Sequence, residues 1–440
     1  MQTNNQQPAS PLPEPQAAPG TLAHENQQLS ALRADQPKTN YMSQALKIIL
    51  RSGKDDALRR FHPWVFSGAI KKMEGRTYEG CLAEVFSNKD EYLGSGVYQD
   101  ATIAVRIMAF APERPDSFDA DFWEKKIRRA FDLRKLTGLT DNPHTNVYRL
   151  IHGEGDHLPG LIIDHYDGHL VIQIHSTGLY AYIDQIAEAL KKVYGEKLRS
   201  IFDKSRETLP AAFWEKTSPG EVIYGECEKT EVLENGHRFV VDINGGQKTG
   251  FYIDQRDNRK LLAGYCKGKE VLNTFCYSGG FSVYALKAGA SGVDSLDSSA
   301  KATALAEENV SLNMGPADIH QTITDDAIRY LNAMEKAYDV IILDPPAYAK
   351  HQHVKHKAVQ GYKRLNLAAL KKIQEGGVLF TFSCSQVVDI QLFRSTVMAA
   401  AIQSGRTVRI LHQLTQPSDH PVNIFHPEGQ YLKGLVLFVD

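Results

Sequence analysis

The spacing of apolar residues differs sharply between the start of the chain and the rest of it. Residues 1–42 are rich in Gln, Asn, Pro and Ala and hold very few large apolar side chains. A segment of this composition cannot bury enough surface to offset the entropy lost on ordering it. We therefore expect residues 1–42 to form a disordered tail.

Residues 43–113 hold short apolar runs separated by Gly, Asn and Asp, a pattern typical of short strands joined by turns. The predicted strands are 45–51, 82–86, 92–98 and 104–109. Short strands at such close spacing predict a small β-barrel or sandwich. The bulky side chains of Trp64 and Phe66 are expected in its core.

Residues 114–235 combine segments with the apolar spacing of a helix and segments with the apolar spacing of strands. Apolar side chains recur at helical spacing over 119–139. The segments that follow are predicted as strands 147–152, 160–164, 170–175 and 199–203, with a helix over 182–194. This pattern indicates an α+β connector domain, and we find no residue in it with recognisable chemistry.

Residues 236–440 form the longest part of the chain in which one pattern of secondary structure repeats regularly. After Gly246, strands rich in β-branched residues alternate with helical stretches, which predicts βαβ units and a parallel sheet covered on both faces. The last two strands, 409–414 and 432–439, have no helix between them. We expect them to pair antiparallel at the sheet edge, which makes the domain α/β overall.

Composition narrows the class of protein. The chain has 440 residues, a formal net charge of −2, 42% hydrophobic and 23% charged residues. These values are typical of a soluble globular protein with about three domains, and they exclude a chain that is basic throughout. Five scattered cysteines argue for a reducing compartment, against a disulfide framework and against a zinc site. Without a membrane span or signal pattern, we expect a cytoplasmic protein with no metal and no membrane partner.

Candidate chemistry lies at the ends of the predicted strands of residues 236–440. The first strand leads into a turn of small residues that contains Gly279, the second ends in Asp297, and the third is followed by Asp325 and Asp326. Each acid alone is more often a helix N-cap. Acids at successive strand ends instead favour a nucleoside pocket, with Asp297 on the ribose. The fingerprint G-x-G-x-x-G is absent, which argues against a nicotinamide dehydrogenase.

Two further strand ends carry residues suited to catalysis. The fourth strand ends in Asp344-Pro345-Pro346, a rigid loop that directs the carboxylate toward the ligand side of a parallel sheet. The fifth ends in Ser383-Cys384-Ser385, where a cysteine is better placed as a nucleophile than as a buried filler. Cys276, in the first turn, is interpreted as a packing residue.

A basic run separates these two motifs. Residues 350–372 hold seven Lys and Arg side chains and no acid. A basic segment beside the reactive residues fits a polyanionic substrate, although it also fits a solvated helix face. His351, His353 and His356 interleave with the lysines, but nothing around them resembles a metal-ligand set.

Together these residues resemble the class I S-adenosylmethionine-dependent methyltransferases. More closely, they are similar to the bacterial 23S ribosomal RNA cytosine-C5 methyltransferases that carry an N-terminal PUA domain. The resemblance covers residues 45–440. Its most specific segments are HPWVFSG (62–68), GEGDHLPGL (153–161), QKTGFYIDQR (247–256), FCYSGGF (275–281), DPP (344–346) and FSCS (382–385).

The resemblance implies an RNA-binding PUA-like barrel, a small middle domain and a Rossmann-like catalytic domain. It also implies S-adenosyl-L-methionine as cofactor, 23S ribosomal RNA as partner, Cys384 as nucleophile and Asp344 as a catalytic residue beside it. The implied cofactor-binding residues are Thr249, Phe251, Gln255, Phe275, Tyr277, Gly279, Asp297, Asp325, Asp326 and Asp344. The sequence departs from the family at one place, which the resemblance puts beside the target base. Relatives carry a bulky residue directly after the double proline, whereas this chain has Ala347 and then Tyr348.

The sequence leaves two other functions open. Asp-Pro-Pro-Ala-Tyr is similar to the signature of enzymes that methylate base nitrogens and need no cysteine. The chain is alternatively an RNA-binding assembly factor with an inactive methyltransferase domain, although the intact acid series argues against this. A homodimer is also left open.

Overall fold

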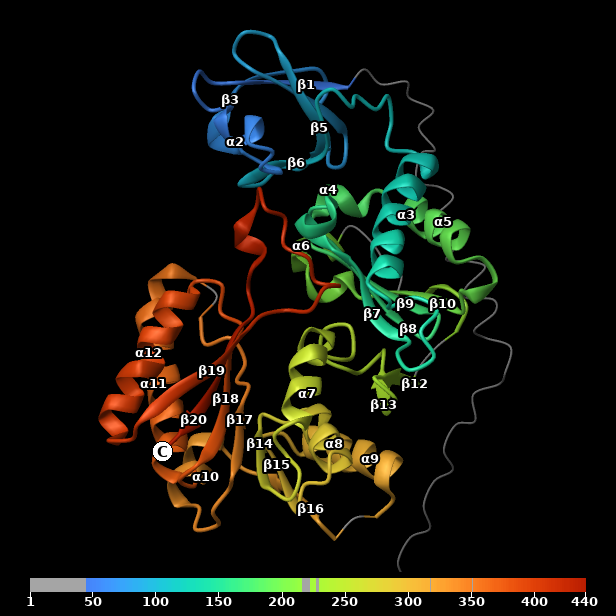
Figure 1. The fold of residues 1–440 in the computed structure, drawn as a ribbon. Coiled ribbons are helices and arrows are strands. Elements are labelled where there is room, and N and C mark those ends of the chain that lie inside the picture. The colour runs from blue at the N-terminus through green and yellow to red at the C-terminus, as the bar shows by residue number, and fades with distance from the viewer. Residues whose placement is uncertain (1–44, 216–221, 227–228, 317, 350) are drawn as a thin grey trace, which may run out of the picture. The chain divides into compact units, whose positions relative to one another are not determined.

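The computed structural model describes residues 45–440 except 216–221, 227–228, 317 and 350. The expected disordered tail, Cys227 and Lys350 therefore lie outside the described residues (Figure 1). Residues 45–440 form a single unit by their contacts. No helix in this described part is both long and apolar enough to span a bilayer.

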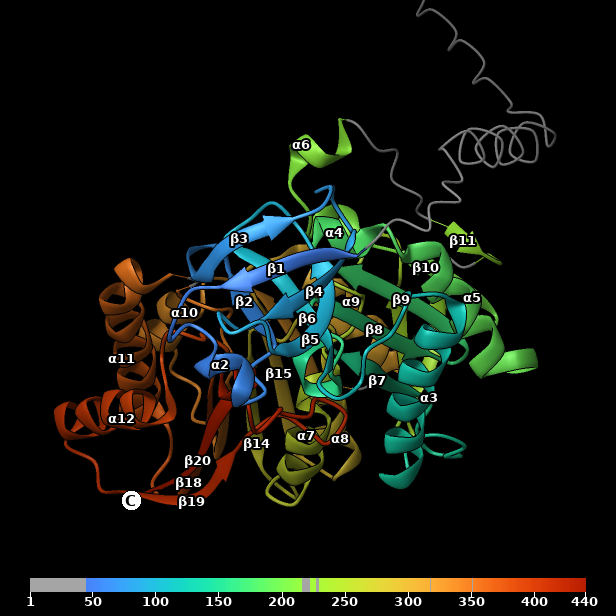
Figure 2. The same ribbon diagram turned by 90° about the horizontal axis from the view of Figure 1, so that it is seen from above.

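The first domain is a curled six-stranded sheet in the order β2-β6-β5-β4-β1-β3 (Figures 1 and 2). Its only parallel pair among the described strands is β1 with β4. Val, Leu and Ile side chains from the strands fill its interior, for example Ile48, Val85 and Val105. The elements are β1 (Leu46–Leu50), α2 (Asp56–Arg59), β2 (Trp64–Phe66), β3 (Ile70–Glu74), β4 (Leu82–Phe86), β5 (Tyr92–Tyr98) and β6 (Ile103–Phe110).

The expectation that Trp64 and Phe66 lie in the core of this sheet is wrong. Side chains alternate between the two faces of a strand, and in β2 it is Val65 that is buried. Trp64 is therefore half-buried on the other face, and Phe66 is 44% exposed. Strands β2 and β3 were not anticipated, because they are short and their apolar residues do not alternate regularly.

The middle domain packs helices α3 and α5 against a sheet in the order β11-β10-β9-β8-β7. Asp119 caps α3 by accepting the amide N–H of Phe122 at 3.0 Å. The elements are α3 (Ala120–Leu136), β7 (Val147–His152), β8 (Leu161–Tyr166), β9 (His169–Ile174), α4 (Thr177–Tyr180), α5 (Ile183–Tyr194), β10 (Ser200–Asp203), α6 (Ala211–Trp214) and β11 (Val222–Tyr224).

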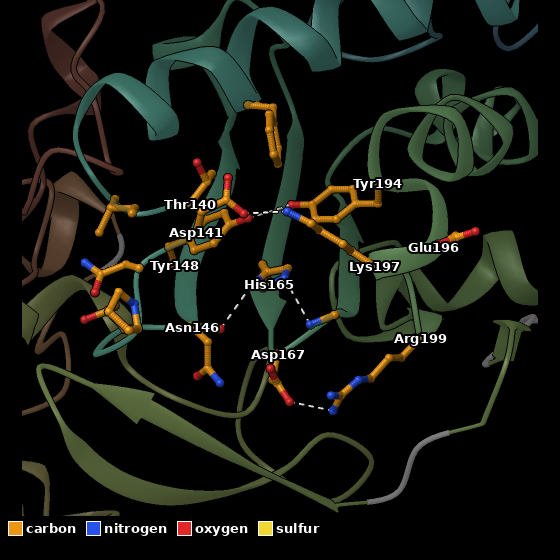
Figure 3. A pocket seen from close by; sticks show the side chains of 16 residues that line it. Thr140, Asp141, Asn146, Tyr148, His165, Asp167, Tyr194, Glu196, Lys197 and Arg199 are labelled. Atoms are coloured by element: carbon orange, nitrogen blue, oxygen red, sulfur yellow. Dashed lines mark hydrogen bonds and ion pairs between the residues drawn. The ribbon is translucent and has the colours of Figure 1, made fainter.

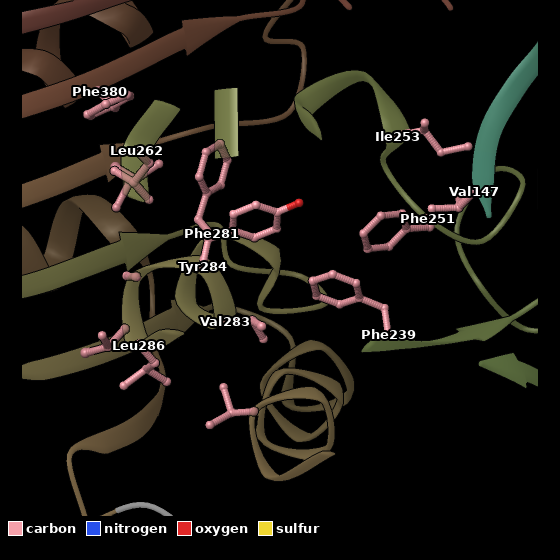
Figure 4. Close-up of a cluster of buried hydrophobic side chains, with 14 of the residues drawn as sticks. Val147, Phe239, Phe251, Ile253, Leu262, Phe281, Val283, Tyr284, Leu286 and Phe380 are labelled. Carbon is pink, nitrogen blue, oxygen red and sulfur yellow. The ribbon is translucent and has the colours of Figure 1, made fainter. Parts of the chain in front are cut away.

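A hairpin that the sequence pattern did not predict connects the middle and last domains. Its strands are β12 (Lys229–Glu234) and β13 (His237–Asp242). Val232 and Phe239, one from each strand, belong to a core cluster that also contains Val147 and Phe281 (Figure 4). The expected boundary between residues 235 and 236 thus falls in the turn of this hairpin.

The last domain is a seven-stranded sheet in the order β16-β15-β14-β17-β18-β20-β19, with the first five strands parallel. As expected, the final two strands pair antiparallel, and β19 is the edge. The strands are β14 (Glu270–Thr274), β15 (Gly292–Asp297), β16 (His320–Thr324), β17 (Val340–Leu343), β18 (Gly377–Ser383), β19 (Val408–Leu414) and β20 (Lys433–Val439).

Helices cover both faces of this sheet (Figure 1). Val271 and Ile342 face a cluster that includes α7 and α8, whereas the neighbouring Leu272 and Ile341 face a cluster built from α10, α11 and α12. The near-continuous apolar runs of the strands follow from this burial on both faces. The helices are α7 (Arg256–Ala263), α8 (Gly280–Lys287), α9 (Ala300–Met314), α10 (Ala327–Ala333), α11 (Lys355–Lys372) and α12 (Ile390–Ser404).

Candidate active site

The sheet reverses its strand order at β14, which pairs with β15 on one side and β17 on the other. Ligands of such sheets bind at the carboxyl ends of the strands beside this reversal. Phe275 and Tyr277 follow β14 with positive φ angles of 56° and 43°. At Gly279 a Cβ atom would lie 2.9 Å from the Cβ of Ala306, so only glycine lets this turn approach α9 so closely.

Asp297 stands at the end of β15 and joins the two neighbouring turns. Its Oδ2 accepts the amide N–H of Tyr277 at 3.1 Å, and its Oδ1 accepts the amide N–H of Ser299 at 2.9 Å. A carboxylate has about four acceptor positions, and the side chain is only half-buried. Asp297 therefore retains acceptor capacity for the hydroxyl groups of a ligand.

Asp325 and Asp326 follow β16, and the structure brings the first of them next to Asp297. The amide N–H of Asp325 donates to the carbonyl oxygen of Asp297 at 3.0 Å. Its carboxylate pairs with Arg329, which lowers the pKa of Asp325. Asp326 caps α10 by accepting the amide N–H of Arg329 at 2.9 Å. Both side chains thus have local structural partners in addition to any ligand.

Asp344 directly follows β17 and is half-buried. Burial and the nearby negative charge of Asp254 raise the pKa of its carboxyl group to about 7, although a hydrogen bond from Gln255 opposes the shift. Asp344 is therefore protonated in a large fraction of molecules at neutral pH, and the carboxyl group can act as a hydrogen-bond donor.

Cys384 directly follows β18 and lies beside Asp344, as expected. Its Sγ is 3.9 Å from the carbonyl oxygen of Pro345, the residue after Asp344. Burial and the charge of Asp344 raise the pKa of the thiol to about 11, whereas Lys248 and Lys433 act to lower it. Cys384 is half-buried, while the other thiol of this region, Cys276, is buried.

The sequence interpretation missed three charged residues around the Cys384 thiol, which are Lys248, Asp254 and Lys433. Lys433, at the start of β20, is buried and donates to the carbonyl oxygens of Ser385 at 2.7 Å and Tyr431 at 2.6 Å. Burial lowers its pKa to about 8. The Oδ2 atom of Asp254 accepts the hydroxyl of Tyr431 at 2.7 Å, and its buried Oδ1 has no hydrogen-bond partner.

Two of these three residues had a usable signal in the sequence. Lys248 and Asp254 lie within the specific segment 247–256, whose only residues singled out were Thr249, Phe251 and Gln255. Lys433 is the only charged residue of an otherwise apolar final strand. Nothing in the sequence connects that strand with Cys384, because the antiparallel pairing of β18 with β20 creates the contact.

The segment 249–255 approaches Asp344 through Gln255, while its other two singled-out side chains have structural partners. The hydroxyl of Thr249 donates to Asp164 Oδ2 at 2.6 Å and accepts the hydroxyl of Tyr166 at 3.0 Å. Phe251 is buried with its ring centroid 5.0 Å from that of Phe239 (Figure 4). At Thr249 and Phe251 the backbone is therefore what remains available to a ligand.

Residues 355–372 of the basic run form α11. Lys357 and Arg364 are exposed, and α11 itself contains no acidic residue. Tyr348 packs on this helix: a Cβ at Gly361 would lie 2.8 Å from its ring, and its centroid is 4.7 Å from that of Tyr362. Tyr348 therefore supports α11.

A separate pocket lies in the middle domain (Figure 3). His165 stacks on the rings of Tyr148 and Tyr194 with centroid distances of 4.4 and 5.5 Å. Ion pairs between Asp167 and Arg199 and between Asp141 and Lys197 flank it. None of the site residues predicted from the sequence lines this pocket.

Comparison with known proteins gives independent information on this arrangement. Residues 148–423 match the family model described as S-adenosylmethionine-dependent methyltransferase, and residues 48–110 match a PUA-like domain. The ribosomal RNA large subunit methyltransferase I of Aeromonas hydrophila is 39% identical over 397 residues, covering 89% of this chain and 98% of the relative. The protein of the same name from Alteromonas mediterranea is 38% identical over 395 residues, with the same coverage.

Two solved structures share the fold. A protein of Streptococcus mutans assigned as a SAM-dependent methyltransferase superimposes with a TM-score of 0.75 at 23% identity, covering 89% of this chain and 100% of that one. A second structure, of a protein assigned as a methyltransferase and complexed with SAH, has a TM-score of 0.76 at 24% identity and the same coverage. The two family matches, together with this shared fold, confirm the expected PUA-like and Rossmann-like methyltransferase architecture.

Proposed function

Because this chain belongs to the family of S-adenosylmethionine-dependent methyltransferases that includes the ribosomal RNA large subunit methyltransferases I, we propose that it forms 5-methylcytosine in 23S ribosomal RNA. In this proposal Cys384 forms a transient covalent bond to carbon 6 of the target cytosine. The observation that carries the proposal is the juxtaposition of the half-buried Cys384 thiol with the Asp344 carboxyl, whose pKa is about 7.

S-adenosylmethionine is the cofactor of this family. When bound, it supplies an electrophilic methyl group carried on a sulfonium sulfur. The residues at the carboxyl ends of β14 to β17 fit such a group. Asp297 has spare acceptor positions for ribose hydroxyls, and Gly279 keeps the turn free of a side chain. The buried Oδ1 of Asp254 also has no partner within the protein.

We assign cofactor contacts to the residues at these strand ends and in the preceding segment. Asp297 would hold the ribose, Asp325 or Asp326 the adenine, and Gly279 would lie by the methionine part. The complete proposed set is Thr249, Phe251, Gln255, Phe275, Tyr277, Gly279, Asp297, Asp325, Asp326 and Asp344. For Thr249 and Phe251 we assign the contact to the backbone, because their side chains already have partners within the protein.

The chemical role of Cys384 follows from the weak nucleophilicity of carbon 5 of cytosine. After loss of its proton, the thiolate donates an electron pair to carbon 6. The π electrons of the ring then shift toward N3, and carbon 5 becomes an enamine carbon that can accept a methyl group. When the proton on carbon 5 is later removed by a base, the carbon–sulfur bond breaks, the ring double bond re-forms and the thiolate leaves.

Asp344 is suited to stabilise the charge that develops during this addition. A carboxyl with a pKa of about 7 is partly protonated at neutral pH and can donate its proton to N3 as carbon 6 is attacked. The same carboxylate can take that proton back when the thiolate is eliminated. Lys248 and Lys433 favour the thiolate form of Cys384 through their positive charge.

The proposal also assigns a role to each domain of the chain and names RNA as its partner. We assign residues 43–113 to RNA binding, 114–235 to a middle domain and 236–440 to catalysis, with 1–42 as an additional tail. The match of a PUA-like domain over residues 48–110 supports the first assignment. Two observations support RNA as the partner. The relatives described above are named as ribosomal RNA methyltransferases, and helix α11 is basic and contains no acidic residue. We assign the protein to the cytoplasm, because a substrate of this kind is found there.

A trapping experiment with RNA that carries 5-fluorocytosine tests the role of Cys384. Fluorine on carbon 5 cannot leave as a proton, so the wild-type chain with S-adenosylmethionine should form an adduct that survives a denaturing gel. Cys384→Ser should form no adduct and lose nearly all methyl transfer, while SAH binding by calorimetry persists. Cys276→Ala, the matched change of the neighbouring thiol, should still form the adduct.

Two results would contradict the cysteine mechanism. One is an adduct that maps to Cys276, and the other is methyl transfer by Cys384→Ser at a rate close to that of the wild type. Methyl groups found on a base nitrogen would then favour nitrogen methylation at the Asp344-Pro345-Pro346 loop. A wild-type chain that binds no SAH would instead favour an inactive assembly factor.

A further inference from the structure

Two histidines and a glutamate meet where the PUA-like domain contacts the loop between β19 and β20. His62 lies just before β2, whereas His426 and Glu428 belong to that loop. One potential ligand atom from each of the three lies within 4.8 Å of the others. The Nε2 atom of His62 is 4.0 Å from Glu428 Oε1, and the Nε2 atom of His426 is 3.8 Å from Glu428 Oε2.

The ligand atoms of this cluster have no other strong partner. The Nδ1 atom of His62 accepts the amide N–H of Trp64 at 3.3 Å, which leaves Nε2 directed at Glu428. His426 is only 3% exposed, and neither of its ring nitrogens has a hydrogen-bond partner. A buried polar atom without a partner is costly. The unpartnered imidazole of His426 therefore indicates a ligand.

Packing holds these rings in place without using their nitrogen atoms. The ring centroid of Trp64 lies 4.5 Å from that of His426, and Trp64 Nε1 donates to Glu154 Oε1 at 2.9 Å. The backbone N–H of His426 donates to the carbonyl oxygen of Asn423 at 2.8 Å. Asn423 in turn donates to the carbonyl oxygen of Glu154 at 3.2 Å. The cluster is thus built into the contact between the domains.

We propose that His62, His426 and Glu428 bind one divalent transition-metal ion of the zinc type, with water in the fourth position. Two imidazole nitrogens and one carboxylate oxygen suit Zn²⁺, whereas Mg²⁺ and Ca²⁺ prefer ligand sets made of oxygen. Tetrahedral bonds of about 2.0–2.1 Å place ligand atoms about 3.3 Å apart. The two histidine–glutamate separations of 4.0 and 3.8 Å are within an ångström of this value.

The metal would join two domains that carry different functions. His62 belongs to the PUA-like domain, and the other two ligands belong to the loop that precedes the last strand of the catalytic sheet. Because the ion binds only when both parts are in contact, it stabilises that contact by mass action. The role is structural and independent of the methylation chemistry proposed above.

Zinc titration of the full-length, untagged chain tests this proposal. The protein is first treated with a chelator, dialysed, and titrated with Zn²⁺ alone in a calorimeter. We expect one tightly bound equivalent and a rise in melting temperature. Glu428→Gln changes an exposed side chain and His62→Asn a mostly buried one, and each should weaken zinc binding at least tenfold and abolish the thermal shift. The double variant His351→Asn/His353→Asn, an exposed histidine pair elsewhere, should bind zinc like the wild type.

Several results would overturn the proposal. Absence of zinc binding to the wild-type chain would do so, as would full-affinity binding by both Glu428→Gln and His62→Asn. Loss of zinc binding in His351→Asn/His353→Asn would instead place the metal in the segment that precedes α11. Substitution of Co²⁺ provides a second readout, because a tetrahedral site with two imidazoles should give a visible absorption band that disappears in Glu428→Gln.

Discussion

Asp344 and Cys384 have pKa values displaced in the same direction for the same physical reason. Burial disfavours the charged form of each group, and each lies near a second acidic group. Near pH 7 the Cys384 thiol is therefore largely neutral, whereas Asp344 is protonated in only part of the molecules. A neutral Asp344 is ready to donate a proton, but a neutral Cys384 must first be ionised, which makes the nearby cations Lys248 and Lys433 important.

The raised pKa of Asp344 predicts a pH-dependent effect of Asp344→Asn on stability. The carboxyl has its ordinary pKa of 3.8 in the unfolded chain and a pKa of about 7 when folded. The folded state thus holds a proton that the unfolded state has lost, and its stability falls as pH rises from 3.8 through 7. We expect the variant to melt about 2–6 °C higher than the wild type at pH 8, with a smaller difference at pH 5.

Thermal melts at both pH values provide the measurement for Asp344→Asn. The matched control is Asp318→Asn, which changes an exposed carboxylate and should shift the melting temperature equally little at both pH values. An equal gain for Asp344→Asn at pH 5 and pH 8 would show that the carboxyl is not held in its neutral form.

At the scale of elements, α11 begins earlier than the sequence pattern indicates. Helical periodicity predicts a helix only over 362–373, whereas α11 spans Lys355–Lys372. The first two turns are rich in Lys and His rather than apolar residues, and the N-cap residue Val354 makes no side-chain capping bond. Neither an apolar stripe nor a capping residue therefore marks its start. The early start places the lysines on a regular helix.

We expect Lys355, Lys357 and Lys363 on α11 to contact RNA phosphates. Changing all three to Gln should weaken RNA binding and flatten the dependence of log K on log salt by about 0.7–0.9 for each phosphate that is no longer neutralised. Fluorescence anisotropy at several salt concentrations measures this slope. Lys260→Gln/Lys267→Gln/Lys287→Gln, a matched triple change of exposed lysines around α7 and α8, should leave the slope as in the wild type. An unchanged slope for the α11 variant would show that the run is only a solvated face.

At the scale of the whole molecule, a buried ion pair of the catalytic domain also accepts hydrogen bonds from the middle domain. Asp419 lies in the loop between β19 and β20 and accepts from Arg256 at 2.7 Å and from the backbone N–H of Arg149 at 2.9 Å. Its carbonyl oxygen accepts from Arg134 of α3 at 2.8 Å. The arginine charge holds the pKa of Asp419 well below its usual range.

Asp419→Asn should destabilise the chain strongly at neutral pH, by about 3–5 kcal/mol, because it leaves Arg256 buried without its anion. The folded pKa of Asp419 is depressed below the ordinary value of 3.8. Its stabilising contribution is therefore fully present above pH 3.8 and is lost as pH falls below that value. The melting temperatures of variant and wild type should converge as the pH is lowered.

The matched control for Asp419→Asn removes an exposed ion pair. Asp121 contacts Lys192 at 3.0 Å, but its side chain is 87% exposed, so Asp121→Asn should change stability by at most about 1 kcal/mol. A loss of similar size for both variants would mean that burial does not strengthen the Asp419 contacts.

The sequence by itself determined those features that depend on local periodicity and on the order of elements. Alternating strands and helices predicted the parallel sheet, and the missing last helix predicted the antiparallel pair β19–β20, because side-chain period and connection length are local properties. They also placed Asp344 and Cys384 together, since the carboxyl ends of parallel strands meet at one edge of the sheet.

Only the tertiary structure decided the contacts between residues that are distant in sequence. The pairing of β18 with β20 brings Lys433 to Cys384, and the alternation of side chains in β2 turns Trp64 outward toward His426. His62 and His426 stand in different domains with no ligand spacing between them, so the expectation of a chain without metal rested on the scattered cysteines and on the surroundings of His351, His353 and His356. Such clusters arise from packing and long-range strand pairing, which periodicity and motif spacing do not encode.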